Sequence, residues 1–425
     1  MLVCAARVSA ACGSDRRSFD SYQEKPLVTP GQRRRKNVLV PAAHSLGGIG
    51  VIRSLGRAGY RVHAVAPSRD ALGLASRYAD ERAVHPPLSS EEFQGWFDDY
   101  VKRNDIALVM PGGGFDPDAS FARKHEAVFP FNGGPQQGAI AASKFRLFER
   151  LSQHDGEAAA HLPPFLLVDL AAPLPTADEL ASLGVPLFIK LDGALGTTGA
   201  SGDDVLRCPN GEAARAALQR LAADYSHALV QGYVAGRGVG AFTLRWDCRT
   251  VARMMHRRLH EMPHTGGASS LRQSWWMPEI MADAEAKLAA IGWQGVAMVE
   301  YRYDEASGEF WLMEINFRFW GSLHLSLYAG VDFPRLLADS FFGDVPAQLV
   351  EGDIGIRCRH LYPHELGYLV SLWRDRAVSW SRKAWSLVEA VGLTLDPGVR
   401  SDLLFPGDRR LFWRQLRRAL TRRGG

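Results

Sequence analysis

The feature that most constrains the fold of this chain is a pair of acidic residues in two alternating segments. Glu300 lies in residues 296–303 and Glu314 in residues 310–315, and turn-forming residues occupy 304–308. Period-two alternation predicts two strands of an antiparallel hairpin. The hairpin would place Glu300 and Glu314 side by side, with Asn316 on the same face as Glu314.

This predicted cluster has the chemistry of a magnesium site. Two carboxylates and an amide oxygen are hard ligands suited to Mg²⁺, which keeps several waters and binds nucleotide phosphates. Glu314 is surrounded in sequence by apolar residues, where a carboxylate needs a partner. Arg318 would share its face if the strand continued, and would contact a transferring phosphoryl group. The alternative is an ordinary hairpin with exposed acids.

The region upstream reads as a strand–helix–strand unit. Apolar residues 38–42 precede Gly47, Gly48 and Gly50, and a helical stretch then leads to a second apolar segment at 61–66. Such a unit predicts a parallel sheet with a right-handed crossover. The glycines differ from a dinucleotide fingerprint, which would have a third glycine where Arg53 stands. A tight turn is favoured, with a small-ligand site or a redox dinucleotide site as alternatives.

The middle of the chain predicts mixed secondary structure. A helix is expected at 143–151 after the cap Ser143, strands at 186–190 and 228–231, and a glycine loop at 193–199. Long alternating segments at 240–246 and 251–258 join the acidic hairpin in a predicted antiparallel sheet. At 425 residues the chain is long enough for two to four such modules.

Residues 313–322 (Met-Glu-Ile-Asn-Phe-Arg-Phe-Trp-Gly-Ser) and 329–334 resemble the metal-binding strand and following helix of the ATP-grasp superfamily, in its carboxylate–amine ligase branch. Phe317 stands where many relatives have proline. The resemblance covers about 37–345. It implies a multidomain α/β and α+β fold: an open parallel pre-grasp domain at 37–135 and a two-part grasp domain with antiparallel sheets at 136–345, its lid at about 181–228. A leader at 1–36, expected to be disordered, and a mixed C-terminal region at 346–425 complete the chain.

Further positions match the superfamily one by one. Lys144 and Lys190 stand where it places two lysines that bind ATP phosphates, and residues 192–199 resemble its phosphate-covering loop. A lysine at a strand end beside a glycine loop suits a phosphate, although a solvated lysine or a flexible turn is the alternative for each feature alone. The resemblance assigns nucleotide contacts in this loop to Gly193, Gly196, Thr197 and Gly199.

Two other segments resemble substrate-facing parts of the superfamily. Residues 229–236 resemble the hinge that holds adenine, which implies contacts from Gln231, Gly232, Tyr233 and Val234. Gly232 replaces the acid usual in relatives, and no ribose-contacting residue is evident. Arg258 and Arg272 lie in a segment similar to a loop that faces the triphosphate and the acyl acceptor. Both are candidates to bind phosphate or a substrate carboxylate, with surface arginines as the alternative.

Charge and cysteine content exclude some functions. Residues 1–36 carry eight Lys or Arg against three acids, and 409–425 carry seven Arg and no acid, so the body between them is acidic despite a net charge of +4. This distribution weakens a nucleic-acid function. No apolar run reaches the length of a membrane-spanning helix. Five scattered cysteines without zinc spacing favour a reduced, cytoplasmic setting. Residues 409–425 predict a docked basic helix, with weak membrane-surface contact as an alternative.

The resemblance implies an ATP-dependent ligase. Such an enzyme converts a carboxylate to an acyl phosphate and joins it to an amine, releasing ADP and phosphate, with Mg²⁺ or alternatively Mn²⁺. The expected substrates are amino acids or peptide-like molecules, and a homodimer is the expectation at the level of the family. Two alternatives stay open: a carboxyphosphate-type enzyme resembling biotin carboxylase or carbamoyl-phosphate synthase, and a non-catalytic ATP-binding regulator.

Overall fold

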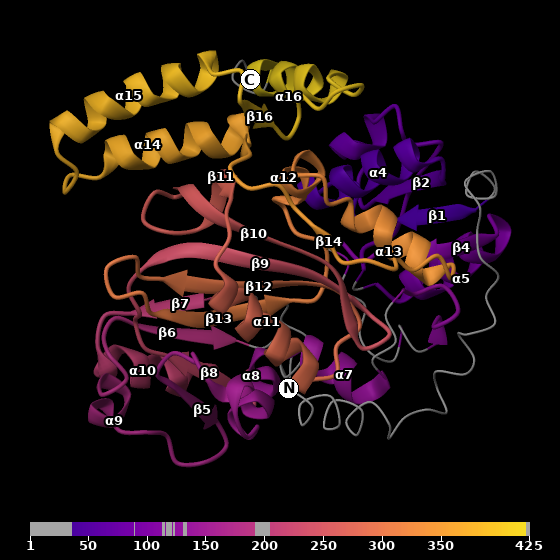
Figure 1. Ribbon diagram of the computed structural model, residues 1–425. Coiled ribbons are helices and arrows are strands. Elements are labelled where there is room, and N and C mark those ends of the chain that lie inside the picture. The colour runs from indigo at the N-terminus through magenta and orange to yellow at the C-terminus, as the bar shows by residue number, and fades with distance from the viewer. Residues whose placement is uncertain are drawn as a thin grey trace.

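A computed structural model of the chain describes residues 36–421 apart from 89, 113–114, 116–120, 122–123, 131–133 and 192–204 (Figure 1). The leader before Lys36 and the predicted nucleotide-binding residues Gly193, Gly196, Thr197 and Gly199 lie outside the described residues. Within them the strands form three sheets. Over the same ranges, no helix is long and apolar enough to cross a membrane.

The first sheet is parallel, as the strand–helix–strand pattern predicted. Its order is β3-β2-β1-β4, with β1 at Asn37–Val40, β2 at Arg61–Ala66, β3 at Glu81–Val84 and β4 at Ile106–Val109. Helix α4 (Leu46–Ala58) joins β1 to β2, while the 3-10 helix η2 (Leu72–Ala75) and α5 (Glu91–Arg103) follow β2 and β3. Ser45 caps α4 by accepting a hydrogen bond from the Gly48 amide at 3.0 Å.

Close packing accounts for the glycines at the start of α4. A Cβ atom at Gly48 would lie 1.9 Å from the Ala42 carbonyl oxygen, and one at Gly47 would lie 2.8 Å from that of Trp320. Only glycine allows the helix to approach both segments. This packing supports the tight-turn interpretation and joins the first sheet to the chain around Trp320.

The second sheet contains the predicted acidic hairpin. Its order is β13-β12-β9-β10-β11-β15-β16, with β14 paired to β10. The strands are β9 (Arg237–Trp246), β10 (Arg249–Met262), β11 (Ala268–Ser274), β12 (Gly295–Tyr303), β13 (Phe310–Asn316), β14 (Val350–Glu351), β15 (Arg357–Arg359) and β16 (Val399–Ser401). Pairing is antiparallel from β13 to β15. One face packs on α11 (Pro278–Ala290), and the other packs on α12 (Leu323–Tyr328) and α13 (Phe333–Phe341), which also contact α4.

The third sheet is smaller and fully antiparallel. Its order is β5-β8-β6-β7, with β5 at Phe165–Asp169, β6 at Leu187–Leu191, β7 at Val205–Cys208 and β8 at His227–Gln231. Helices α9 (Ala177–Ala181) and α10 (Gly211–Leu221) pack on it. Helices α7 (Gly134–Ala141) and α8 (Lys144–Ser152), with the 3-10 helix η3 (Glu157–Ala159), connect it to the first sheet. In Figure 1 β6 lies near β13, and the Lys190 side chain of β6 donates a hydrogen bond to the Met313 carbonyl of β13, so the two antiparallel sheets meet here.

The C-terminal region is mostly helical. A short π-helix η5 (Leu361–Glu365) leads into α14 (Leu366–Arg374), which is followed by α15 (Trp380–Leu395) and the basic helix α16 (Arg410–Thr421). Helix α14 packs against β10 and α15, and α16 packs against η2. The predicted class, a parallel α/β sheet followed by antiparallel sheets, is therefore confirmed.

Candidate functional site

The hairpin register brings the predicted metal ligands together. Glu300 on β12 is directly opposite Glu314 on β13, and Asn316 is opposite Met298. The Asn316 side-chain amide donates to Glu314 Oε1 at 3.0 Å and to Glu300 Oε1 at 3.3 Å. Two carboxylates and one amide thus converge at the end of the hairpin, as the spacing predicted.

Two lysines from distant segments reach the same cluster. Lys144, the first residue of α8, places its Nζ 3.8 Å from Glu314 Oε2, and the Lys190 Nζ on β6 donates to the Met313 carbonyl at 2.8 Å. The side chains of Lys144 and Glu314 are 22% and 29% exposed, so the cluster is open to a ligand. The pKa of Lys190 is lowered to about 8, mainly by burial and in part by the charge of Lys144, while Glu314 and Glu300 oppose the shift.

Arg258 reaches Glu300 across a gap in the intervening strand. It lies on β10, and β9 runs between β10 and β12. The Arg258 guanidinium donates to Glu300 Oε2, to Glu261 Oε1 at 3.2 Å and to the Gly267 carbonyl at 3.0 Å. A Cβ at Gly238 on β9 would lie only 2.8 Å from Arg258 Cδ. A side chain there would therefore displace the arginine from Glu300.

Burial and neighbouring charges shift the pKa values of both Glu300 and Arg258. Burial raises the pKa of Glu300, and the nearby Glu314 acts in the same direction, although Arg258 opposes both. Burial lowers the pKa of Arg258, but Glu300 and Glu261 outweigh burial and raise it above its usual value. Two neighbouring carboxylates in a half-buried position favour a nearby cation.

The residues fit a magnesium ion bound together with nucleotide phosphates. Among the described residues no group of three or more His, Cys, Asp or Glu could hold a metal. The set here has two carboxylates and Asn316, whose Oδ1 would face them if the amide turned over. A protein set this small suits Mg²⁺, because that ion takes its remaining ligands from water and phosphate.

The other two predicted arginines are placed differently. Strand β13 ends at Asn316, so Arg318 lies beyond it, where its Nη1 donates to the Phe319 carbonyl at 3.3 Å. Arg272 is opposite Arg258 in the β10–β11 register, but it is 1% exposed and forms an ion pair with Asp402 near the C-terminus. The structure therefore brings Arg258 into the carboxylate cluster and pairs Arg272 elsewhere.

The proposed adenine hinge follows β8. Gln231 ends the strand and is 2% exposed, and its Nε2 is buried without a hydrogen-bond partner among the described residues. The Gly232 amide donates to the Pro164 carbonyl at 2.9 Å and the Tyr233 amide to the Gly184 carbonyl at 3.3 Å. A Cβ at Gly232 would lie 1.8 Å from the Leu183 carbonyl oxygen, which explains why no acidic side chain stands there.

Sequence reasoning missed the link between Arg258 and Glu300. It treated Arg258 as a substrate or phosphate ligand, whereas the structure makes it the partner of a predicted metal ligand. Gly238 carried the signal, because a missing side chain on the intervening strand leaves room for a long neighbour.

Two antiparallel sheets lie around a cluster of Lys, Glu and Asn side chains. Over residues 227–362 the chain is similar to an ATP-grasp family. The family model described as "ATP-grasp in the biosynthetic pathway with Ter operon" matches residues 227–362, which include the hinge, Arg258 and the acidic hairpin. No curated protein matches the chain significantly.

Solved structures support the fold. An L-amino acid ligase from Bacillus licheniformis matches with a TM-score of 0.53 and 16% identity, covering 72% of this chain and 74% of that one. An N5-carboxyaminoimidazole synthetase from Staphylococcus aureus, complexed with ADP, gives 0.56 and 15%, covering 76% and 80%. The biotin carboxylase domain of the Hydrogenobacter thermophilus 2-oxoglutarate carboxylase, solved with MgADP, gives 0.57 and 17%, covering 75% and 72%.

Proposed function

We propose that this protein is an ADP-forming ligase that activates a carboxylate as an acyl phosphate and joins it to an amine. The observation that carries the proposal is the convergence of Glu300, Glu314 and Asn316 with Lys144 and Lys190. Cationic side chains next to oxygen ligands are what a nucleotide triphosphate and its metal need. The site keeps two lysines for phosphate and two glutamates for a metal, which argues against a purely regulatory role.

The residues divide into those that hold the nucleotide and those that hold the transferring group. Glu300, Glu314 and Asn316 would hold Mg²⁺, or Mn²⁺ in its place, which when bound neutralises charge between the β- and γ-phosphates. Lys144 and Lys190 contact the phosphates, and Gln231–Val234 hold the base. By the resemblance of the sequence, Gly193, Gly196, Thr197 and Gly199, which lie outside the described residues, would contact the phosphates.

The reaction needs no covalent attachment to the protein. A substrate carboxylate oxygen attacks the γ-phosphorus while the bond to the ADP oxygen breaks, and Arg318 stabilises the charge on the phosphoryl oxygens. The amine then attacks the acyl carbon, the bond to phosphate oxygen breaks, and the amine loses a proton. Arg258 holds Glu300 in place throughout, and Arg272 holds Asp402.

The likeness to the L-amino acid ligase supports the proposed substrate class. We propose an amino acid or peptide-like carboxylate and an amino acid or peptide-like amine, with the protein acting as a homodimer. The alternative carboxyphosphate chemistry would use bicarbonate as the carboxylate. The two differ in one measurable requirement, which is dependence of ADP formation on bicarbonate.

The test is ADP and phosphate release with MgATP and pairs of amino acids, with hydroxylamine added to trap the acyl phosphate. The proposal expects a hydroxamate whose formation needs both ATP and the correct acid, and loss of that product in Glu314→Gln. Release of AMP and pyrophosphate would identify an adenylating enzyme instead. ADP release that needs only bicarbonate would assign the carboxyphosphate alternative, and ATP binding without turnover under all substrates would make the protein a regulator.

A further inference from the structure

Helix α15 turns its apolar side to solvent. Trp380 and Leu395 are each 76% exposed, and Val388 and Val391 are each 59% exposed. Their spacing places them along one stripe of the helix. The side of α15 that packs against the protein buries Lys383, Ser386 and Leu393, two of which are polar. Most of the large apolar side chains of this helix therefore face solvent instead of the protein.

The neighbouring helices extend this stripe into a larger surface. Eleven of the nineteen exposed large apolar side chains in the described residues lie between Leu366 and Leu420. We call them the C-terminal apolar face: Leu366, Val370, Trp373, Trp380, Trp385, Leu387, Val388, Val391, Leu395, Trp413 and Leu420. Figure 1 shows α14, α15 and α16, which carry all eleven, along one edge of the molecule. A concentration of this kind marks an interaction site.

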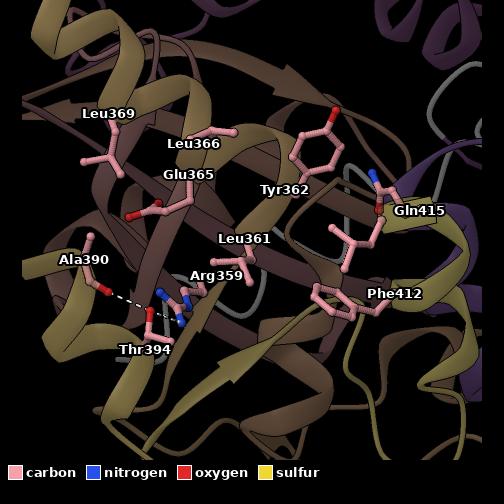
Figure 2. Close-up of a pocket in the computed structure, with 11 residues that line it drawn as sticks. Arg359, Leu361, Tyr362, Glu365, Leu366, Leu369, Ala390, Thr394, Phe412 and Gln415 are labelled. Carbon is pink, nitrogen blue, oxygen red and sulfur yellow. Dashed lines mark hydrogen bonds between the residues drawn. The ribbon is translucent and has the colours of Figure 1, made fainter. Parts of the chain in front are cut away.

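A cavity lies among the same helices. Its volume is about 270 Å³. Figure 2 shows Leu361, Leu366 and Leu369 on one side of it and Phe412 on the other. Leu366 belongs to both the cavity wall and the C-terminal apolar face, so the two are continuous. An apolar chain from a partner can therefore enter between α14 and α16.

The charge around this face selects the partner. Helix α16 carries Arg410, Arg414, Arg417 and Arg418 and no acidic residue, although residues 37–408 as a whole are acidic. In residues 366–395 three basic side chains that are not buried, Arg374, Arg376 and Arg382, accompany two acidic ones. Two copies of this face brought together by a two-fold axis would oppose like charges. The occupant should therefore be anionic as well as apolar.

We propose that the C-terminal apolar face docks the protein on the surface of an anionic lipid bilayer. Exposed Trp and aliphatic side chains enter the boundary between headgroups and acyl chains, and Arg side chains contact the anionic headgroups. Tryptophan is enriched at that boundary, and four of the eleven residues of the face are Trp. When the helices enter the bilayer surface, the acyl chain of a lipid occupies the cavity between α14 and α16. This docking is independent of the proposed ligase activity.

The test is co-sedimentation of the full chain with vesicles of phosphatidylcholine, alone or mixed with phosphatidylglycerol. We expect binding to the mixed vesicles only, weakened by added salt. The face variant Trp380→Ser/Val391→Ser/Leu395→Ser changes only exposed side chains and should bind at least about tenfold less. The matched control Val185→Ser/Ile354→Ser removes residues 50% and 65% exposed outside the face and should bind as the wild type does. Thermal unfolding of both variants checks their folding.

Each remaining outcome contradicts the proposal. If the wild-type protein does not co-sediment with vesicles that contain phosphatidylglycerol, the C-terminal apolar face is not a membrane-docking site. Undiminished binding by the face variant would assign the contact to the eight basic residues of the leader, which that variant retains. Self-association in sedimentation velocity that the face variant abolishes, without vesicle binding, would make the face a dimer interface. Equal binding to neutral vesicles would remove the argument from charge.

Discussion

At the scale of single residues, the site depends on charges that neutralise one another before any ligand arrives. Glu300 pairs with Arg258, and Glu314 lies 3.8 Å from Lys144. Asn316 donates to both carboxylates and so fixes their separation. A nucleotide and its metal would exchange partners with these groups, because lysines prefer phosphate and carboxylates prefer the metal.

Glu314 is the residue whose charge the proposed activity needs most. Glu314→Gln keeps the shape of the side chain and removes one metal ligand, so we expect ATP turnover to fall at least about 100-fold with little change in thermal unfolding. Glu305→Gln, on the exposed turn of the same hairpin, is the control and should keep wild-type turnover. Near-normal turnover in a folded Glu314→Gln protein would contradict the site.

Lys190 should make nucleotide binding sensitive to pH. Because its pKa is lowered to about 8, mainly by burial, the ammonium loses its proton as the pH rises through that value. ATP binds the charged form, so affinity should weaken between pH 7 and pH 9, and binding near pH 8 should take up a proton. Calorimetry in buffers of different ionisation enthalpy measures this uptake.

Lys190→Met supplies the comparison for that measurement. It should bind ATP more weakly than the wild type at pH 7 and show no proton uptake from this position. A wild-type protein with pH-independent affinity between pH 7 and pH 9 would show that the Lys190 ammonium does not contact the nucleotide.

At the scale of elements, regular alternation was enough to predict most of the grasp sheets and their carboxylates. The hairpin at 296–303 and 310–315 is β12 and β13, and the helix after Ser143 is α8. The predicted strand at 240–246 left out the first three residues of β9, where Gly238 interrupts the alternation. The sequence could not show that the apolar stripe of α15 is exposed, because amphipathic spacing does not tell which face of a helix packs against the rest of the protein.

The ion pair between β11 and the C-terminal region also escaped sequence reasoning. Arg272 and Asp402 are both fully buried, and 130 residues separate them. Cys358 on β15 donates its thiol to the same Asp402 carboxylate at 3.2 Å. Only the folded topology brings these three groups together, so residue types and spacing could not have assigned Arg272 this partner.

Removing one member of this ion pair should destabilise the protein, because the other charge stays buried without its partner. Arg272→Met leaves Asp402 unpaired and should lower the free energy of unfolding by about 3 kcal/mol. Arg272→Met/Asp402→Leu removes both charges and should be less destabilised than the sum of the single variants. Urea denaturation measures all three. Additive losses, together with a raised KM for the substrate acid in the double variant, would favour a substrate contact for Arg272.

At the scale of the whole molecule, one buried arginine ties three regions together. Arg53 on α4 contacts Asp408 at 3.1 Å, His324 on α12 at 2.8 Å and the Asp402 carbonyl at 2.5 Å. The first sheet, the grasp sheet and the C-terminal segment therefore share a single polar junction. Its members are 271 to 355 residues apart in sequence, which is why sequence analysis treated Arg53 only as an interruption of a glycine pattern.

Two histidines at this junction are held without charge. Burial lowers the pKa of His324 to about 3, and Arg53 acts in the same direction. Burial likewise lowers the pKa of His360 to about 3, against the opposing effect of Asp402. Both ring nitrogens of His360 are buried without a hydrogen-bond partner among the described residues. A proton on either ring would have no solvent to stabilise it.

The stability of the protein should therefore fall in mild acid. An unfolded histidine takes up a proton near pH 6.5, whereas these two stay neutral in the fold down to about pH 3. Between those values the unfolded state binds more protons, so the free energy of unfolding decreases as the pH drops, by up to about 2.7 kcal/mol per pH unit for both groups.

Urea denaturation at pH 7.5 and pH 5 measures the loss. His360→Phe should reduce this loss, because one of the groups that take up a proton only on unfolding is then missing. His154→Gln, at a half-buried position outside this junction, should leave the loss as it is. An unchanged loss in His360→Phe would mean that His360 is not held neutral by the junction.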